Sequence, residues 1–330
     1  MKKLFFLLSL ALVIQLNAQK ITKENFDQIQ QIELSIKDTG KAMVMSDVMF
    51  NRFKADSFFT RGLVQALKVP NSFYYPFDSL ITISKLYAPD SSFRIFTWQV
   101  MKDESYYRQR GAIQIFTKDG SLKLIPLFDM SDFTNAPTDS VRDNQRWIGA
   151  IYYNCLLNTY AGKKYYTLLG FDDNNSRSNK KWIDVLTFDE TGKPQFGGRY
   201  FQYQNDSIKP NQPAYRFCLE YKKDAKTRMN YDPELQMIVF DHLISEDNDL
   251  SEKFSLIPDG SYEAFKWGNG KWIHVPMLAV QKVDMRGVDP MLGNAPGEAP
   301  IFDKDGKIDQ KKLDEQNKKN QQIPPKKGND

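Results

Sequence analysis

The chain has 330 residues, and its hydrophobic content of 41% is enough for a sizeable core. Its two cysteines are too few for a disulfide-stabilised scaffold. The 45 basic and 41 acidic residues nearly balance and are interleaved along the chain, which argues against a surface for binding nucleic acid.

The N-terminus has the layout of a secretory signal peptide. Lys2 and Lys3 precede an apolar run from Leu4 to Ile14, and Ala18 supplies the small residue expected at a cleavage site. This pattern predicts a cleavable signal peptide over residues 1–18. The apolar run is much shorter than the roughly 20 residues that a membrane-spanning helix needs.

The rest of the chain contains no apolar run long enough to span a bilayer, and no cysteine near the cleavage site is available for lipid attachment. Removal of residues 1–18 removes two lysines and no acidic residue, which lowers the net charge from +4 to +2. We therefore expect a soluble exported protein without a transmembrane segment. Its expected location is the periplasm, with release outside the cell as the alternative.

Two helices are predicted after the signal peptide. Apolar residues recur at helical spacing over 22–40 and again over 46–68, before Pro70 and Pro76 break the pattern. We expect these helices to form an N-terminal segment, residues 19–76, that packs on the remainder of the protein.

Residues 77–280 have the pattern of a β domain, with two-residue periodicity, many β-branched and aromatic residues, and short turns between the runs. Turn sequences such as Gly268-Asn269-Gly270 predict hairpins, so neighbouring strands should pair antiparallel. The predicted strands are 80–87, 92–101, 111–118, 121–128, 148–158, 163–171, 180–188, 195–203, 214–222, 226–231, 235–243, 261–267 and 271–277.

The expected fold is therefore mainly β, a large antiparallel meander that curls into a barrel-like or sandwich arrangement. A propeller is the alternative, although the irregular spacing of the turns disfavours it. Both faces of strand 180–188 are partly apolar, which indicates a strand between two layers. The composition of residues 281–330 predicts a disordered polar tail.

Four stretches resemble a family of uncharacterised secreted proteins from Bacteroidota. They are Asn71 to Leu80, Phe93 to Trp98, Tyr165 to Asn175 together with Ile183 to Leu186, and Met237 to Leu243. The resemblance implies an exported envelope protein. It implies no activity and no functional residue.

Two modifications can be considered in an exported protein. Cys155 and Cys218 either form a disulfide in the oxidising compartment or remain as two buried thiols. Ser79, Ser140 and Ser207 each follow an aspartate and precede an apolar residue, a pattern similar to the O-glycosylation acceptor of Bacteroidota.

The candidate chemistry is sparse. His242 and His274 do not have the spacing of paired metal ligands, so we expect both to be structural, and we expect no cofactor. The oxygen-rich loop Asp172 to Ser176 could wrap a calcium ion, but a polar turn is the preferred interpretation.

The sequence therefore favours a non-enzymatic envelope protein that binds or assembles with another envelope component, a protein or a glycan. The alternative is a secreted glycan hydrolase. Such an enzyme needs two carboxyl groups across one sugar ring. The candidates near aromatic strands are Asp172, Asp184, Glu220 and Asp241.

Overall fold

The computed structural model describes residues 21–103, 106–203, 214–247 and 249–278. All of these belong to the first of the chain's two compact units, residues 1–281. The predicted signal peptide, the predicted polar tail over 281–330 and Ser207 lie outside the described residues.

The two predicted helices are present and form a hairpin. Helix α2 spans Lys23–Met45 and begins at Thr22, whose side chain accepts a hydrogen bond from the Asn25 backbone N–H. Helix α3 spans Met49–Leu67. Ile29, Ile36 and Met43 of α2 share one face at seven-residue spacing and are buried against α3 and the first sheet.

The strands form three sheets. Sheet A has the order β1-β2-β3-β4, sheet C has β5-β9-β8-β7-β6 with β11 paired to β8, and sheet D has β10-β15-β14-β13-β12. The bounds in chain order are β1 Ser84–Tyr87, β2 Phe93–Asp103, β3 Tyr106–Ile115, β4 Lys123–Phe128, β5 Arg142–Asp143, β6 Ile151–Tyr160, β7 Lys163–Asp172, β8 Ser178–Phe188, β9 Pro194–Phe196, β10 Phe201–Gln202, β11 Phe217–Lys222, β12 Met229–Asp232, β13 Met237–Ser245, β14 Leu256–Gly268 and β15 Lys271–Val275.

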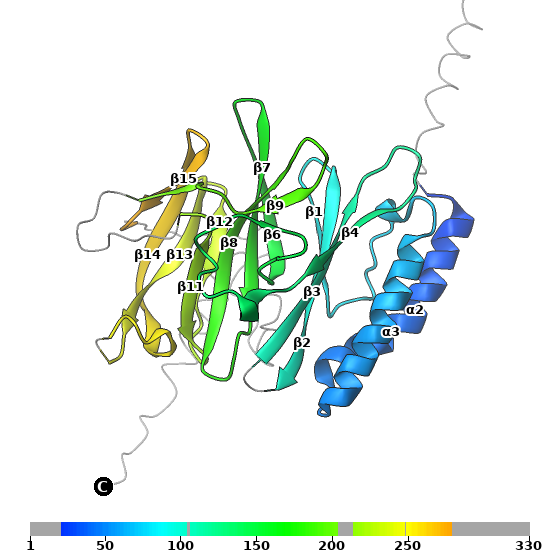
Figure 1. The fold of residues 1–330 in the computed structure, drawn as a ribbon, viewed down its shortest axis with the longest axis horizontal. Helices are drawn as coiled ribbons and strands as arrows, with labels where there is room; N and C mark the ends of the chain where they lie inside the picture. The colour runs from blue at the N-terminus through cyan, green and yellow to red at the C-terminus, as the bar shows by residue number, and fades with distance from the viewer. Residues whose placement is uncertain (1–20, 104–105, 204–213, 248, 279–330) are drawn as a thin grey trace, which may run out of the picture. The chain divides into compact units, whose positions relative to one another are not determined.

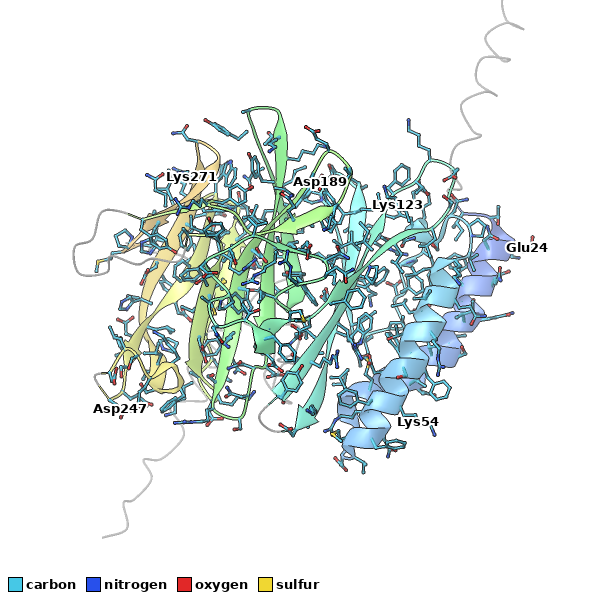
Figure 2. All side chains as sticks on the ribbon, viewed as in Figure 1. Glu24, Lys54, Lys123, Asp189, Asp247 and Lys271 are labelled. Atoms are coloured by element: carbon cyan, nitrogen blue, oxygen red, sulfur yellow. The ribbon has the colours of Figure 1, made fainter. Side chains whose placement is uncertain are left out.

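The helices and the three sheets stack as four layers (Figure 1). The first apolar core joins the helices to one face of sheet A, the second joins sheet A to sheet C, and the third joins sheet C to sheet D. Figure 2 draws side chains both in the spaces between these layers and on the outer faces. Sheets A and C are therefore covered on both faces.

Alternation along single strands explains this double coverage. In β8, Trp182 and Leu186 contribute to the second core, whereas Ile183 and Val185 contribute to the third. The prediction that strand 180–188 lies between two layers is confirmed.

The expected fold class is confirmed in its sandwich form, since the sheets are stacked and not closed into a barrel. Strand pairing is antiparallel except that β10 pairs parallel with β15. Predicted strand 195–203 is two short strands in different sheets, because Gly197 adopts a φ of 82° that interrupts the extended backbone. None of the helices that the structure describes is long and apolar enough to cross a membrane.

Candidate functional site

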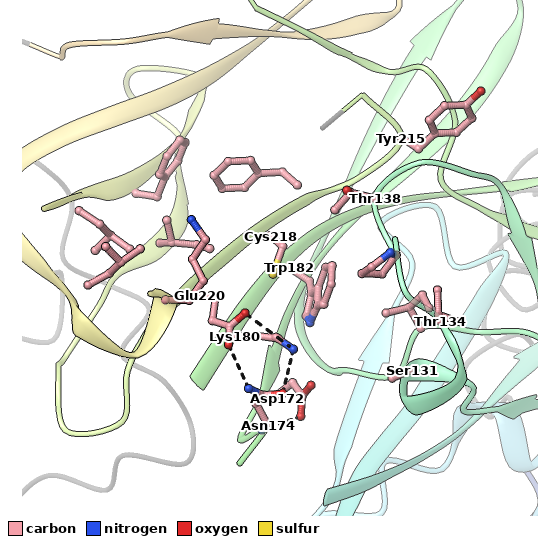
Figure 3. Close-up of a pocket in the computed structure, with 18 of the residues that line it drawn as sticks. Ser131, Thr134, Thr138, Asp172, Asn174, Lys180, Trp182, Tyr215, Cys218 and Glu220 are labelled. Atoms are coloured by element: carbon pink, nitrogen blue, oxygen red, sulfur yellow. Dashed lines mark hydrogen bonds and ion pairs between the residues drawn. The ribbon is translucent and has the colours of Figure 1, made fainter. Parts of the chain in front are cut away.

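A cleft of about 1620 Å³ opens beside β11. Its walls come from the start of β3, the segment 131–139, strands β7, β8 and β11 of sheet C, and strands β13 to β15 of sheet D. Segments more than 150 residues apart in sequence thus meet at one site. Figure 3 shows part of this wall.

The cleft has a side on each face of β11. Successive side chains of a strand point to opposite faces. Cys218 accordingly packs toward the second core, and Phe217 and Leu219 toward the third. We name the first side the polar lobe, which consists of Gln109, Asp172, Asn174, Lys180, Trp182 and Glu220. We name the second side the histidine lobe, which consists of Tyr203, Phe217, Phe240, His242, Glu263 and His274.

Three charged residues of the polar lobe lie opposite one another on neighbouring strands. Asp172 of β7 pairs with Lys180 of β8, and Lys180 pairs with Glu220 of β11. The Lys180 ammonium lies 3.9 Å from the Glu220 carboxylate and donates to the side-chain oxygen of Asn174 at 2.8 Å. Asn174 in turn donates to Glu220 at 3.3 Å, which closes the triangle of dashed lines in Figure 3.

The Asp172 carboxyl is buried at the base of this lobe. One of its oxygens accepts hydrogen bonds from the Gln109 side-chain amide at 2.7 Å and from the Asn174 backbone N–H at 2.9 Å. Burial raises the pKa of Asp172 to about 7, against the opposing effects of the Asn174 N–H and the Lys180 charge. A substantial fraction of Asp172 is therefore protonated near neutral pH and able to donate a proton or a hydrogen bond.

The histidine lobe brings together both histidines of the chain. His274 Nε2 lies 2.5 Å from one Glu263 carboxylate oxygen, and His242 Nε2 lies 3.8 Å from the other. His242 Nδ1 also contacts the Asp259 carboxylate at 3.0 Å. Burial and the charge of Glu263 raise the pKa of the adjacent Tyr203 hydroxyl.

Of the four predicted carboxylate candidates, the structure brings two together. Asp172 and Glu220 both contact Asn174 in the polar lobe. Asp241 lines the cleft near the histidine lobe and accepts a hydrogen bond from the Arg228 backbone N–H. Asp184 lies elsewhere, buried against Arg216 at 3.3 Å.

The loop considered for calcium binding is a hydrogen-bonded turn. The Asn175 side-chain oxygen accepts from the backbone N–H groups of Arg177 and Ser178, and the Asp173 carboxylate pairs with Lys223 at 3.1 Å. These contacts agree with the preferred interpretation as a polar turn. Within the described ranges, no group of three or more His, Cys, Asp or Glu side chains is arranged to hold a metal ion.

The two cysteines are free thiols in the structure. Cys155 lies on β6 and Cys218 on β11, with β7 and β8 between them. Three strand spacings correspond to about 14 Å, twice the largest Cα separation of about 7 Å that a disulfide spans. This separation disfavours the disulfide; of the two thiols, Cys155 is buried and Cys218 is partly buried.

Two of the three serine candidates lie in the described chain, and both are half-buried. The Ser79 backbone N–H donates to the Glu33 carboxylate at 2.7 Å, and the Ser140 hydroxyl donates to Asp139 at 3.0 Å. Modification of either serine stays a prediction.

Three residues of the polar lobe were not predicted from the sequence as part of a site. They are Gln109, Lys180, which pairs with Glu220, and Trp182, which lines the cleft. The alternation of strand 180–188 showed that Lys180 and Trp182 share a face, but it did not show that this face ends in a cleft. Gln109 gave no signal, because it stands in a stretch that the periodicity left outside the predicted strands. Comparison of the chain with protein-family models, with curated proteins and with solved structures gives no match.

Proposed function

We propose that the protein is an exported binding protein of the cell envelope, and that its ligand occupies the cleft beside β11. The observation that carries this proposal is the cleft itself, which is large enough for a ligand of several rings and has both aromatic and polar walls. The signal-peptide pattern and the resemblance to secreted proteins support the location. The ligand is part of the envelope, a glycan or a segment of another protein.

The test is native mass spectrometry of the mature protein purified from the envelope of its own cell. We expect a mass above that of the polypeptide that disappears on unfolding. The substitution Thr138→Trp places a large ring at the cleft wall that Figure 3 shows, and it should abolish the extra mass. The matched control, Ser57→Trp on the exposed face of α3, should retain it. Equal occupancy in the two variants would mean that the ligand is not bound in the cleft.

A second candidate function is glycan hydrolysis, which one observation favours. Asp172, with its pKa raised to about 7, and Glu220, beside Lys180, have different environments within one lobe. Such a pair can supply a proton donor and an ionised base. In that case the wild type should release reducing ends from an envelope glycan, and Asp172→Asn or Glu220→Gln should reduce the rate at least 100-fold.

A further inference from the structure

Trp182 differs from the other buried tryptophans of the chain. Three of the five tryptophans donate their indole N–H to a side-chain oxygen at 2.9 Å; these pairs are Trp98 with Asp56, Trp147 with Tyr152, and Trp272 with Thr167. Trp182 is 4% exposed, and its Nε1 has no hydrogen-bond partner among the described residues. In Figure 3 this nitrogen points toward the part of the cleft where Asp172 and Lys180 lie.

A second unpartnered atom lies in the same lobe. Gln109 is 1% exposed, and its side-chain NH₂ group donates to Asp172 at 2.7 Å and to Gln99 at 3.2 Å. Its side-chain oxygen accepts no hydrogen bond from any residue that the structure describes. The polar lobe thus contains a buried donor and a buried acceptor that both lack partners.

Unpaired buried polar atoms are unfavourable, at about 1–3 kcal/mol each, so native proteins retain few of them without a role. A ligand that supplies both an acceptor for Trp182 and a donor for Gln109 would remove this cost. A hydroxyl group is both a donor and an acceptor. A ligand with several hydroxyl groups can therefore satisfy both atoms.

The charges of the lobe indicate that the ligand is neutral. The Lys180 ammonium and the Glu220 carboxylate neutralise each other at 3.9 Å. The Asp172 carboxyl already accepts two hydrogen bonds and is buried. Neither a cationic nor an anionic ligand would find an unpaired opposite charge there.

We propose that the polar lobe binds a neutral sugar ring, with the Trp182 indole N–H and the Gln109 side-chain oxygen hydrogen-bonded to its hydroxyl groups. This inference rests on the proposed binding function and names the class of its ligand. The aromatic rings of Tyr106 and Tyr107, which also line the cleft, provide apolar surface for the C–H faces of the sugar.

The test is titration calorimetry of the mature chain with neutral tetrasaccharides of glucose, xylose and N-acetylglucosamine, and with tetragalacturonate as a charged probe. We expect at least one neutral probe to bind, with tetragalacturonate weaker. Trp182→Phe should lower the affinity about tenfold, the effect of losing one hydrogen bond of about 1.4 kcal/mol. Gln109→Met also removes the hydrogen bonds to Asp172 and Gln99, so it should lower the affinity at least as much. Trp267→Phe, outside the cleft, should bind as the wild type does.

Thermal unfolding without ligand shows whether a variant loses affinity because a contact is lost or because the protein is misfolded. Trp182→Phe removes an unpaired donor but also shortens a ring buried in the second core, so we expect it to unfold cooperatively, within about 5 °C of the wild type without ligand. Equal affinity of Trp182→Phe and the wild type would overturn the proposal, as would preference for tetragalacturonate or failure of every neutral probe to bind at 10 mM. The native mass spectrometry test separates the two proposals. If the calorimetry results contradict sugar binding but Thr138→Trp still displaces a native ligand, the sugar assignment fails and the proposed binding function stands.

Discussion

The Asp172 carboxyl is a buried acid at the candidate site. Its pKa is about 7 in the folded protein, against about 3.9 in an unfolded chain. The folded state therefore binds the proton more tightly. Stability associated with this group is fully present below pH 4 and is lost as the pH rises toward 7 and above. The shift sets an upper bound of about 4 kcal/mol on this loss.

The substitution Asp172→Asn tests this linkage. The Asn side-chain oxygen can still accept from Gln109 and Asn174, but it does not ionise. We expect the free energy of unfolding in urea to increase for the variant relative to the wild type between pH 4 and pH 8, by about 2–4 kcal/mol. Hydrogen bonds lower the pKa of Asp189, so Asp189→Asn should show no such increase. A pH-independent difference for Asp172→Asn would contradict the raised pKa.

The two thiols should be unreactive in the folded protein. Burial raises the pKa of Cys155 to about 12 and also raises that of Cys218, so little thiolate exists at pH 8. We expect iodoacetamide to modify neither residue in native protein and both after unfolding in urea. Reaction in urea that requires prior reduction would show that the chain carries a disulfide after all.

At the scale of single elements, the two helices pack tightly where Gly62 of α3 meets Ile36 of α2. A Cβ atom on Gly62 would lie 2.3 Å from Ile36 Cγ2. We expect Gly62→Ala to destabilise the protein by about 1–3 kcal/mol through overpacking, which exceeds the roughly 1 kcal/mol gained in helix propensity.

Ile36→Leu moves the branch away from Cβ, so Gly62→Ala should be less destabilising in that background. Ser57→Ala, on the exposed face of α3, is the control and should change the free energy of unfolding by less than about 0.5 kcal/mol. A Gly62→Ala variant as stable as Ser57→Ala would show that the helices separate without loss.

Most elements could be predicted because each carries its own periodicity, but their ends depended on tertiary contacts. The N-cap of α3 is Val48, which is 54% exposed, whereas the predicted helix started at residue 46. Strand β14 begins at Leu256, five residues before the predicted start, and continues through Pro258 and Gly260. Pro-Asp-Gly normally signals a turn. Here the facing strand β13 has an irregular register between Asp241 and Leu243, which accommodates these residues within the pairing.

At the scale of the whole molecule, the stack of four layers could not be predicted from strand patterns. Alternation shows that a strand is buried on both faces, as for β8, but it does not show which sheet lies on which side. The cleft was even harder to predict, because its polar lobe combines side chains from four strands. These are Gln109, Asp172, Lys180 and Glu220. Pairing across strands, and not spacing along the chain, places these residues together.

The proposed export also concerns the whole chain, and its test is the N-terminus of the mature protein. We expect protein isolated from the envelope to begin at Gln19. Ala18→Arg should block processing, because the cleavage site requires a small residue. Lys20→Arg changes a neighbouring residue after the site and should be processed normally. A mature chain that retains Met1 would remove the basis for the envelope location.

The layers follow one another along the chain: helices, then sheet A, then sheet C, then most of sheet D. A polypeptide that emerges N-terminus first from a secretion channel can therefore assemble vectorially, with each finished face serving as the template for the next. Local pairing of this kind also avoids long loop closures, which slow folding. We expect a chain truncated after residue 225 to retain amide protection in α2, α3 and sheet A. Loss of all protection would instead indicate that the four layers form only in concert.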